Sequence, residues 1–419
     1  MTRWRWKLLQ LSRKLWVRAS LLGLVGLAAA VSSIYIERYV PWDFPLEISA
    51  SAVESLLTII ASSMLAVTTF SLSTMLSAFG AATNSVSPRA TPLLLEDRLA
   101  QNVLSSFVGS FIFSIVGIVV LKTGAYGERG RFILFLVTIA VIVMIVVMLL
   151  RWINHLLLLG RMGETTGRIE AAAARALEER LAAPYLGGLP LDEREREPPE
   201  AAVIHRAQDA GYLQHVDLPA LQSLAGAAGV RLRLPINPGK FVFPGTVLCW
   251  HERPQEAEID ADALRDAFSI GVARGFDQDP RFGVAVLAEV GSGALAPSRS
   301  DGATAIDILG RLGRLMTLWG EGALARQAAE PEPIYPNLLV RPLSDKDLFE
   351  DAFMIIGRDG AGMIEVQIRL AKVLDALSRI GSEEFRAAAR YHAELSAARA
   401  AECLSLPQDR ERLARALED

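Results

Sequence analysis

Residues 55–82 read SLLTIIASSMLAVTTFSLSTMLSAFGAA, an apolar stretch that contains no Asp, Glu, Lys or Arg. A helix of about 20 mostly apolar residues crosses the hydrocarbon core of a bilayer, because each residue advances the helix by about 1.5 Å. Apolar runs of similar length precede and follow this stretch. We therefore expect a membrane domain over residues 1–160 with four transmembrane helices, at about residues 17–37, 53–80, 102–122 and 132–151.

The first apolar run follows Arg and Lys residues and so also has the charge pattern of a cleaved signal peptide. It is longer than the core of a signal peptide, and no clear small-x-small cleavage site occurs before Glu37. Three further apolar runs follow it. We therefore interpret the first run as a transmembrane helix.

Basic residues concentrate in three segments, at residues 3–18, 89–98 and 151–175, and are sparse in the two remaining loops. The positive-inside rule places these three segments in the cytoplasm. The pattern predicts a multi-pass protein of the bacterial inner membrane with both termini cytoplasmic. Tryptophans near the ends of the expected helices are typical of interfacial anchors: Trp4, Trp6, Trp16, Trp42 and Trp152.

The charge balance differs between the two parts of the chain. Residues 1–155 contain 13 Lys or Arg and 7 Asp or Glu, whereas the remaining residues contain 30 and 40. The basic part suits anionic membrane lipid as a partner, and the acidic part argues against nucleic acid. The two cysteines, Cys249 and Cys403, are far apart, and the five histidines have no metal-ligand spacing. We therefore expect no cofactor, no metal site and no enzymatic activity.

The second apolar run carries small and hydroxylated residues at helical spacing. At about 100° per residue, one arc of roughly 100° contains Ser55, Thr58, Ser62, Ala66, Thr69, Ser73 and Ser77. Such a stripe can form a tight helix–helix interface, because small residues allow close approach. It can also line a narrow wet path in an oligomer. Helix–helix packing is the more common role of such stripes, so the sequence favours packing over pore lining.

Two short features flank the stripe. Glu54 lies at its outer end, and we interpret it as a solvated carboxylate rather than as part of a cation-attracting ring. At the inner end Pro88 must end the helix, which predicts a short cytoplasmic elbow. The candidate residues of this elbow are Ser87, Pro88, Arg89, Asp97 and Gln101. Arg89 is expected to pair with Asp97 or with lipid phosphate.

The chain resembles the bacterial predicted membrane proteins grouped as domain of unknown function 2254. The resemblance begins with Ser87-Pro88-Arg89, Asp97-Arg98, Gln101 and the run FVGSFIF at 107–113. It continues through AGYLQHVD at 210–217, GKFVFPG at 239–245, QDPRFG at 278–283 and LAEVGSGALAP at 287–297. The chain has Ala296-Pro297 and Ser300-Asp301-Gly302 where the family pattern has Ser-Pro followed by Asn-Asp-Pro, which puts any function tied to those residues in doubt. The resemblance implies the architecture and no activity.

Beyond the membrane part, residues 161–200 read as a helix and a linker, and residues 201–419 as a cytoplasmic α+β domain. Short strands are expected between 203 and 250, with helices at 219–228, 260–276, 281–294 and 303–319 and a helical remainder from 342 to 417. Polar residues at the helix junctions form candidate effector loops, with Gln278, Asp279, Asp301 and Asp307. Helix capping explains Asp279 and Asp301 without any ligand.

These features favour a homo-oligomeric ion channel or permeation pathway gated by its cytoplasmic domain. The alternative is a non-conducting membrane scaffold or sensor whose cytoplasmic domain binds a protein or a small molecule. The two hypotheses differ in whether the stripe contacts water or another helix. The sequence leaves the ion or effector open.

Overall fold

The computed structural model describes residues 6, 17, 20, 21, 23, 24, 27, 28, 49–85, 87–90, 93, 97–124, 128–156, 162–253, 258–328 and 332–418. The chain divides into two compact units. Residues 7–165 form the membrane unit, and residues 1–6 together with 166–419 form the C-terminal unit.

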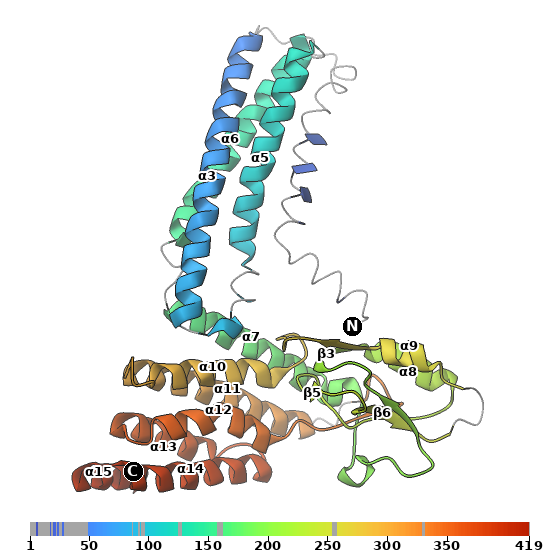
Figure 1. Ribbon diagram of the computed structural model, residues 1–419, viewed down its shortest axis with the longest axis vertical. Coiled ribbons are helices and arrows are strands. Elements are labelled where there is room, and N and C mark those ends of the chain that lie inside the picture. Colours follow the sequence, from blue (N-terminus) through green and yellow to red (C-terminus); the bar gives the residue numbers. More distant parts are fainter. Residues whose placement is uncertain are drawn as a thin grey trace. The chain divides into compact units, whose positions relative to one another are not determined.

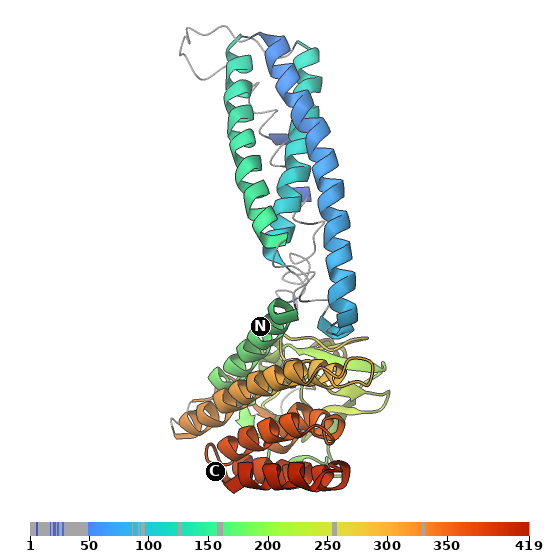
Figure 2. The same cartoon turned by 90° about the vertical axis from the view of Figure 1, so that its left-hand side faces the viewer.

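Three helices of the membrane unit are long and apolar enough to cross a membrane, over Ala50–Gly80, Leu99–Lys122 and Gly130–Leu156. They belong to α3 (Ala50–Ser85), α5 (Arg98–Lys122) and α6 (Glu128–Leu156), which run side by side in Figures 1 and 2. Their positions agree with the three expected spans at 53–80, 102–122 and 132–151. The expected first span, 17–37, lies for the most part outside the described residues.

Helix α5 packs against both α3 and α6. The face of α3 that meets α5 is apolar, and Val53, Leu57, Ile60 and Met64 on it are buried. Gly117 of α5 permits the close approach, because a Cβ atom there would lie 3.0 Å from Leu57 Cδ1. The core of the membrane unit is therefore a seam of tightly packed apolar side chains along α5.

The C-terminal unit contains two small sheets. The five-stranded sheet has the order β1 (Leu189–Pro190), β8 (Leu338–Val340), β4 (Leu232–Leu234), β6 (Val247–His251) and β2 (Val203–Arg206). Strand β8 runs parallel to both of its neighbours, whereas β6 runs antiparallel to β4 and β2. The three-stranded antiparallel sheet has the order β5 (Phe241–Val242), β3 (Gly211–Val216) and β7 (Phe268–Gly271).

Helices make up the remainder of the C-terminal unit. Those near the sheets are α7 (Met162–Ala182), α8 (Leu218–Ala227) and α9 (Ala261–Asp266). The others stack in layers in Figure 2: α10 (Pro280–Ala294), α11 (Gly302–Ala328), α12 (Asp345–Asp359), α13 (Ile364–Leu377), α14 (Glu383–Cys403) and α15 (Pro407–Glu418). The expected combination of apolar membrane helices and an α+β region is confirmed.

One core lies among the strands and helices α8 and α9. Leu213, Leu221, Leu232, Leu264 and Val340 are fully buried in it, and each comes from a different strand or helix. Burial of apolar side chains from elements so far apart in sequence holds the two sheets and these helices in one unit.

Two local predictions differ from the structure. The helix expected over 260–276 is wrong, because α9 ends at Asp266 and residues 268–271 form β7, which pairs with β3. The linker expected at the end of residues 161–200 contains a strand, because Leu189–Pro190 form β1, which pairs with β8. In both segments, hydrogen bonds to a strand distant in sequence override the local pattern.

Candidate functional site

The hydroxylated stripe of α3 lies on the outside of the described helix bundle. All seven of its residues are exposed: Ser55, Thr58, Ser62, Ala66, Thr69, Ser73 and Ser77. The opposite face, with Leu57, Ile60 and Met64, is the one buried against α5. The expectation that the stripe packs against a neighbouring helix is therefore not met by α5 or α6 of the same chain.

Most hydroxyl groups of the stripe already have acceptors within their own helix. Ser55, Thr58 and Thr69 donate to the carbonyl oxygens of Ser51, Glu54 and Leu65, at 2.8, 2.8 and 2.9 Å. Such i−4 bonds satisfy the donor without any external group. Because these side chains are exposed, their hydroxyl oxygens can still accept from water or contact a cation.

Most of the buried serines in the described bundle come from α5, which the sequence pattern did not single out, and α3 contributes Ser71. Ser105, Ser106, Ser110 and Ser114 are all buried on this helix. Ser110 donates to the carbonyl of Ser106 at 2.8 Å. Small residues of α5 thus pack inside the described bundle, and the spacing of these serines in the sequence was the available signal.

Glu54 and Lys122 form an ion pair at one end of the bundle, with Glu54 Oε1 3.1 Å from Lys122 Nζ. Both side chains are partly exposed, at 39% and 65%. The carboxylate is therefore neutralised within its own chain. This pairing agrees with the interpretation of Glu54 as an ordinary surface carboxylate and gives no support to a ring of free carboxylates.

The candidate inner elbow contains a short 3₁₀ helix, Pro88–Ala90. Ser87 is buried, and its Oγ accepts from the backbone N–H of Arg89 at 3.2 Å. Pro88 and Arg89 are exposed. Gln101 is buried in the first turn of α5. The expected change of direction after the second span is therefore present.

Asp97 contacts both helices that meet at this elbow, α5 and α6. Its Oδ1 caps α5 by accepting from the backbone N–H groups of Leu99 and Ala100, at 2.8 and 3.2 Å. Its Oδ2 lies 2.8 Å from Nε2 of His155, in the last turn of α6. Both side chains are at most 10% exposed. One carboxylate therefore joins the start of α5 to the end of α6, and no sequence pattern indicates His155 as its partner.

In the C-terminal unit, Asp279 forms a buried ion pair. It stands at the N-cap position of α10 but makes no capping hydrogen bond. Its two carboxylate oxygens instead accept from Nε and Nη2 of Arg274, at 2.7 and 3.1 Å. Burial raises the pKa of Asp279, and the two bonds from Arg274 oppose that shift. The expectation that Asp279 is a helix cap is therefore wrong, because the guanidinium offers a stronger, bidentate interaction.

A second cation, Arg180 of α7, approaches the same carboxylate. Burial lowers the pKa of Arg180 to about 10, and the negative charge of Asp279 partly offsets this by raising it. Its guanidinium donates to Asn237 Oδ1 and to the carbonyl of Gln278, both at 3.4 Å. Gly239 packs on Asp279 so closely that a Cβ atom there would lie 2.1 Å from Oδ2. We call this cluster the polar junction: Arg180, Asn237, Gly239, Arg274, Gln278 and Asp279.

The polar junction brings together motifs that carried the family resemblance. Gln278 binds the edge of the segment 210–217 through both ends of its amide: Oε1 accepts from Val216 N at 2.9 Å and Nε2 donates to Val216 O at 3.4 Å. Gly239 comes from the segment 239–245, and Asp279 from 278–283. These hydrogen bonds and ion pairs are internal, so the junction holds the sheet, α7 and α10 in place and does not present a free carboxylate to an effector.

The two other candidate effector residues do not join this cluster. Asp301 caps α11, with Oδ1 3.0 Å from Thr304 N, and the bonds from Thr304 lower its pKa. Asp307 lies on the surface of α11, where its Oδ2 accepts from Arg311 at 2.7 Å. Asp279 precedes α10 and Asp301 follows it, so a helix of about 22 Å separates them. The four residues therefore do not form one loop site.

Trp6 lies against His215 and Asp277, beside the polar junction, and we call these two residues the cradle. Its ring stacks on that of His215, with centroids 4.9 Å apart and planes within 5°. Its Nε1–H donates to Asp277 Oδ2 at 3.0 Å. Trp6 is only 5% exposed.

Trp152 is also buried, among apolar side chains of the membrane unit. The expectation of interfacial anchors is therefore wrong for these two tryptophans, because each is enclosed by protein.

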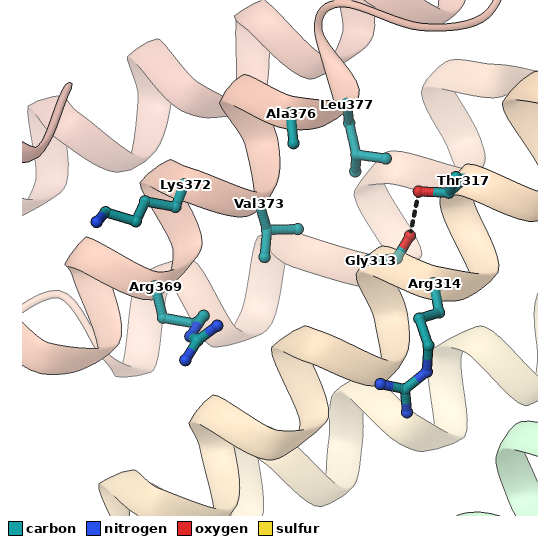
Figure 3. A pocket seen from close by; sticks show the side chains of 8 residues that line it. All are labelled: Gly313, Arg314, Thr317, Arg369, Lys372, Val373, Ala376 and Leu377. Atoms are coloured by element: carbon teal, nitrogen blue, oxygen red, sulfur yellow. Dashed lines mark hydrogen bonds between the residues drawn. The ribbon is translucent and has the colours of Figure 1, made fainter. Parts of the chain in front are cut away.

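A groove of about 410 Å³ opens between α11 and α13 (Figure 3). Its lining includes Gly313, Thr317 and Val373, and a Cβ atom at Gly313 would lie 3.2 Å from Val373 Cγ1. Its cations are Arg314, Arg369 and Lys372. Arg314 is held by Glu170 of α7, at 2.8 Å. Among the described residues, no acidic partner is found for Arg369 or Lys372.

A bundle of apolar membrane helices joined to a large α+β unit defines a multi-span membrane protein. The family described as predicted membrane protein (DUF2254) matches residues 12–376, and the chain belongs to that family. The chain is also similar to the uncharacterized proteins Mb1321c of Mycobacterium bovis and Rv1290c of Mycobacterium tuberculosis, with 32% identity over 133 residues in each case. The match covers 30% of this chain and 25% of each relative, so it spans only about a quarter of their length. No solved structure matches the chain.

Proposed function

We propose that the protein forms a homo-oligomeric assembly in which α3 helices from several copies surround a permeation path controlled by the C-terminal unit. The observation that carries this proposal is the exposure of the whole hydroxylated stripe, from Ser55 to Ser77, on the outside of the described bundle. A stripe of this kind gains little from contact with lipid tails. Copies of it around an axis would provide both close approach and polar oxygens.

The proposal also includes a fourth membrane crossing within residues 7–49 and a cytoplasmic location of both ends. Residues 1–6 and 166–419 belong to one compact unit, which supports placing both ends of the chain on the same side of the membrane. Three described helices can cross between them, and an even total requires one further crossing. The apolar run at 17–37 has the required length, and the distribution of Lys and Arg favours the cytoplasm.

Cysteine accessibility tests the path. In a chain carrying Cys249→Ala and Cys403→Ala, we expect Ser62→Cys, Thr69→Cys and Ser73→Cys in reconstituted vesicles to react with a small water-soluble thiol reagent. Leu136 and Val143 of α6 are exposed but apolar, at 61% and 58%, and their cysteine variants should stay unreactive in lipid. Thr69→Leu should then block ion flux and leave the oligomer intact. Unreactive stripe cysteines in a folded protein, or a monomer in lipid, would contradict the proposal.

The groove between α11 and α13 favours a second candidate function, a non-conducting sensor whose C-terminal unit binds a small anion. Arg369 and Lys372 are exposed cations on one face of α13 in an otherwise acidic part of the chain. Phosphate-bearing molecules are the ligands that such cations attract. Calorimetry of the full chain with inorganic pyrophosphate tests this function. Arg369→Ala with Lys372→Ala should abolish binding, whereas Arg379→Ala, which removes a cation already paired with Asp375, should not.

A further inference from the structure

We propose that the cradle of His215 and Asp277 is a docking site for the N-terminal segment and that Trp6 is the residue that fastens it. The ring of Trp6 meets two requirements at once, a parallel stack at 4.9 Å on His215 and a donated hydrogen bond of 3.0 Å to Asp277. A phenylalanine would supply only the first. The partner that the cradle fits is therefore a tryptophan of this chain, 209 residues before His215 in the sequence.

The cradle is built by contacts that do not involve Trp6. His215 lies on β3 just after an irregularity in the pairing with β7, and it is 1% exposed. Asp277 directly precedes Gln278, whose side chain is bound to Val216 on the same strand. Gln214 donates to the carbonyl of Ala273 at 2.7 Å and so fixes the loop after β7. The two groups that receive Trp6 are thus held in place by the fold of the C-terminal unit.

The position of Trp6 in the chain gives this contact a mechanical consequence. Lys7 begins the membrane unit, and Thr165 ends it. With Trp6 seated, the C-terminal unit therefore holds the chain just before it enters the membrane unit and again just after it leaves. A movement of the C-terminal unit then acts on two segments of the membrane unit. The role of this contact in controlling flux rests on the proposed function, whereas the contact itself does not.

Limited trypsin digestion of the full chain in lipid nanodiscs tests the docking, because Arg5 and Lys7 flank Trp6. The measurement is the rate of cleavage after Lys7, followed by mass spectrometry. Loss of a buried aromatic stack corresponds to about a tenfold faster cleavage. We expect this increase for Trp6→Ala. A smaller increase is expected for Trp6→Phe and for Asp277→Ala, because both remove only the hydrogen bond, and Asp277→Ala leaves the cleavage sequence unchanged.

Trp4→Ala is the matched control, since it removes a tryptophan from the same basic segment and should leave the rate unchanged. Equal rates for the wild type and Asp277→Ala, with both folded by circular dichroism, would overturn the proposal. An equal increase for Trp4→Ala would overturn it too, since any tryptophan of the segment would then serve. Protection that persists in a protein without ion flux would leave the docking in place and remove the proposed function.

Discussion

Polar side chains in the membrane unit and in the C-terminal unit bond over very different distances along the chain. On α3, Ser55, Thr58 and Thr69 bond to carbonyls four residues earlier in the same helix. In the C-terminal unit, Arg281 binds Asp347 and Asp351, which are 66 and 70 residues away. Local bonds leave the outer face of α3 free for another surface, whereas long-range bonds fix the tertiary structure of the C-terminal unit.

The membrane unit also contains a long-range polar contact, at the inner elbow. The buried pair of Asp97 and His155 joins two helices, and Asp97 also caps α5. The comparison therefore predicts that substitutions at long-range polar contacts cost much more stability than substitutions in the stripe.

The largest expected effect is at the polar junction. Gly239 has φ +94° and lies against the carboxylate of Asp279. Gly239→Ala should lower the free energy of unfolding by about 4 kcal/mol or more, because the new methyl group would displace a buried ion pair. Gly245 has a similar φ of +92° with open space around it, so Gly245→Ala should cost only about 1–2 kcal/mol. Denaturant unfolding measures both, and equal losses would refute the role of the ion pair.

The next effect concerns the elbow. Asp97→Ala should destabilise the membrane unit by about 3 kcal/mol, because it removes a helix cap and leaves His155 buried without the carboxylate. The pair of Glu54 and Lys122 is more exposed, so Glu54→Gln should change stability by less than about 1 kcal/mol. Unfolding in mixed micelles compares the two variants. Comparable losses would show that burial does not distinguish these pairs.

A pH effect is expected from two buried histidines of the C-terminal unit. Burial and the neighbouring His251 and Arg265 lower the pKa of His205 to about 4; burial, Arg399 and Lys346 lower that of His392 to about 4. An unfolded histidine has a pKa near 6.5, so the unfolded chain binds protons first as the pH falls. Stability should be complete above about pH 6.5 and should decline from there toward pH 4.

The hydrogen bonds of His205 give this effect a structural reason. His251 Nδ1 lies 2.6 Å from the Glu252 carbonyl and so must donate, which leaves its Nε2 to accept from His205 Nε2 at 3.1 Å. Burial of this contact and the adjacent His251 therefore disfavour a positive charge on His205. The midpoint of thermal unfolding should fall by about 5 °C or more between pH 7 and pH 5. His392→Phe should reduce the fall, and a pH-independent midpoint would contradict the assignment.

The smallest effect is expected on the stripe. Ser62 is exposed and donates to the Thr58 carbonyl at 2.9 Å, so Ser62→Ala removes only a local bond. We expect a change of less than about 0.5 kcal/mol in the stability of the bundle, measured by unfolding in micelles. A loss as large as that of Asp97→Ala would show that the stripe is buried against something essential to the fold.

Periodicity predicted much of the membrane unit correctly. The spacing of Ser62, Thr69 and Ser73 placed them on one face, and Leu57 and Met64 opposite, as the structure confirms. It could not show which face meets α5, because that depends on Gly117 and the serines of a different helix. The same limit applies to residues 268–271, whose pairing partner β3 lies more than 50 residues earlier.

The sequence by itself determined three apolar membrane helices, the uneven distribution of Lys and Arg along the chain, the α+β composition of the C-terminal part and the resemblance to the family. Only the tertiary structure decided that the stripe is exposed, that Asp97 meets His155 and that Trp6 docks on His215 and Asp277. The physical reason is the range of the interactions. Hydropathy and helical period are set by neighbouring residues, whereas these contacts join residues that only the folded chain brings together.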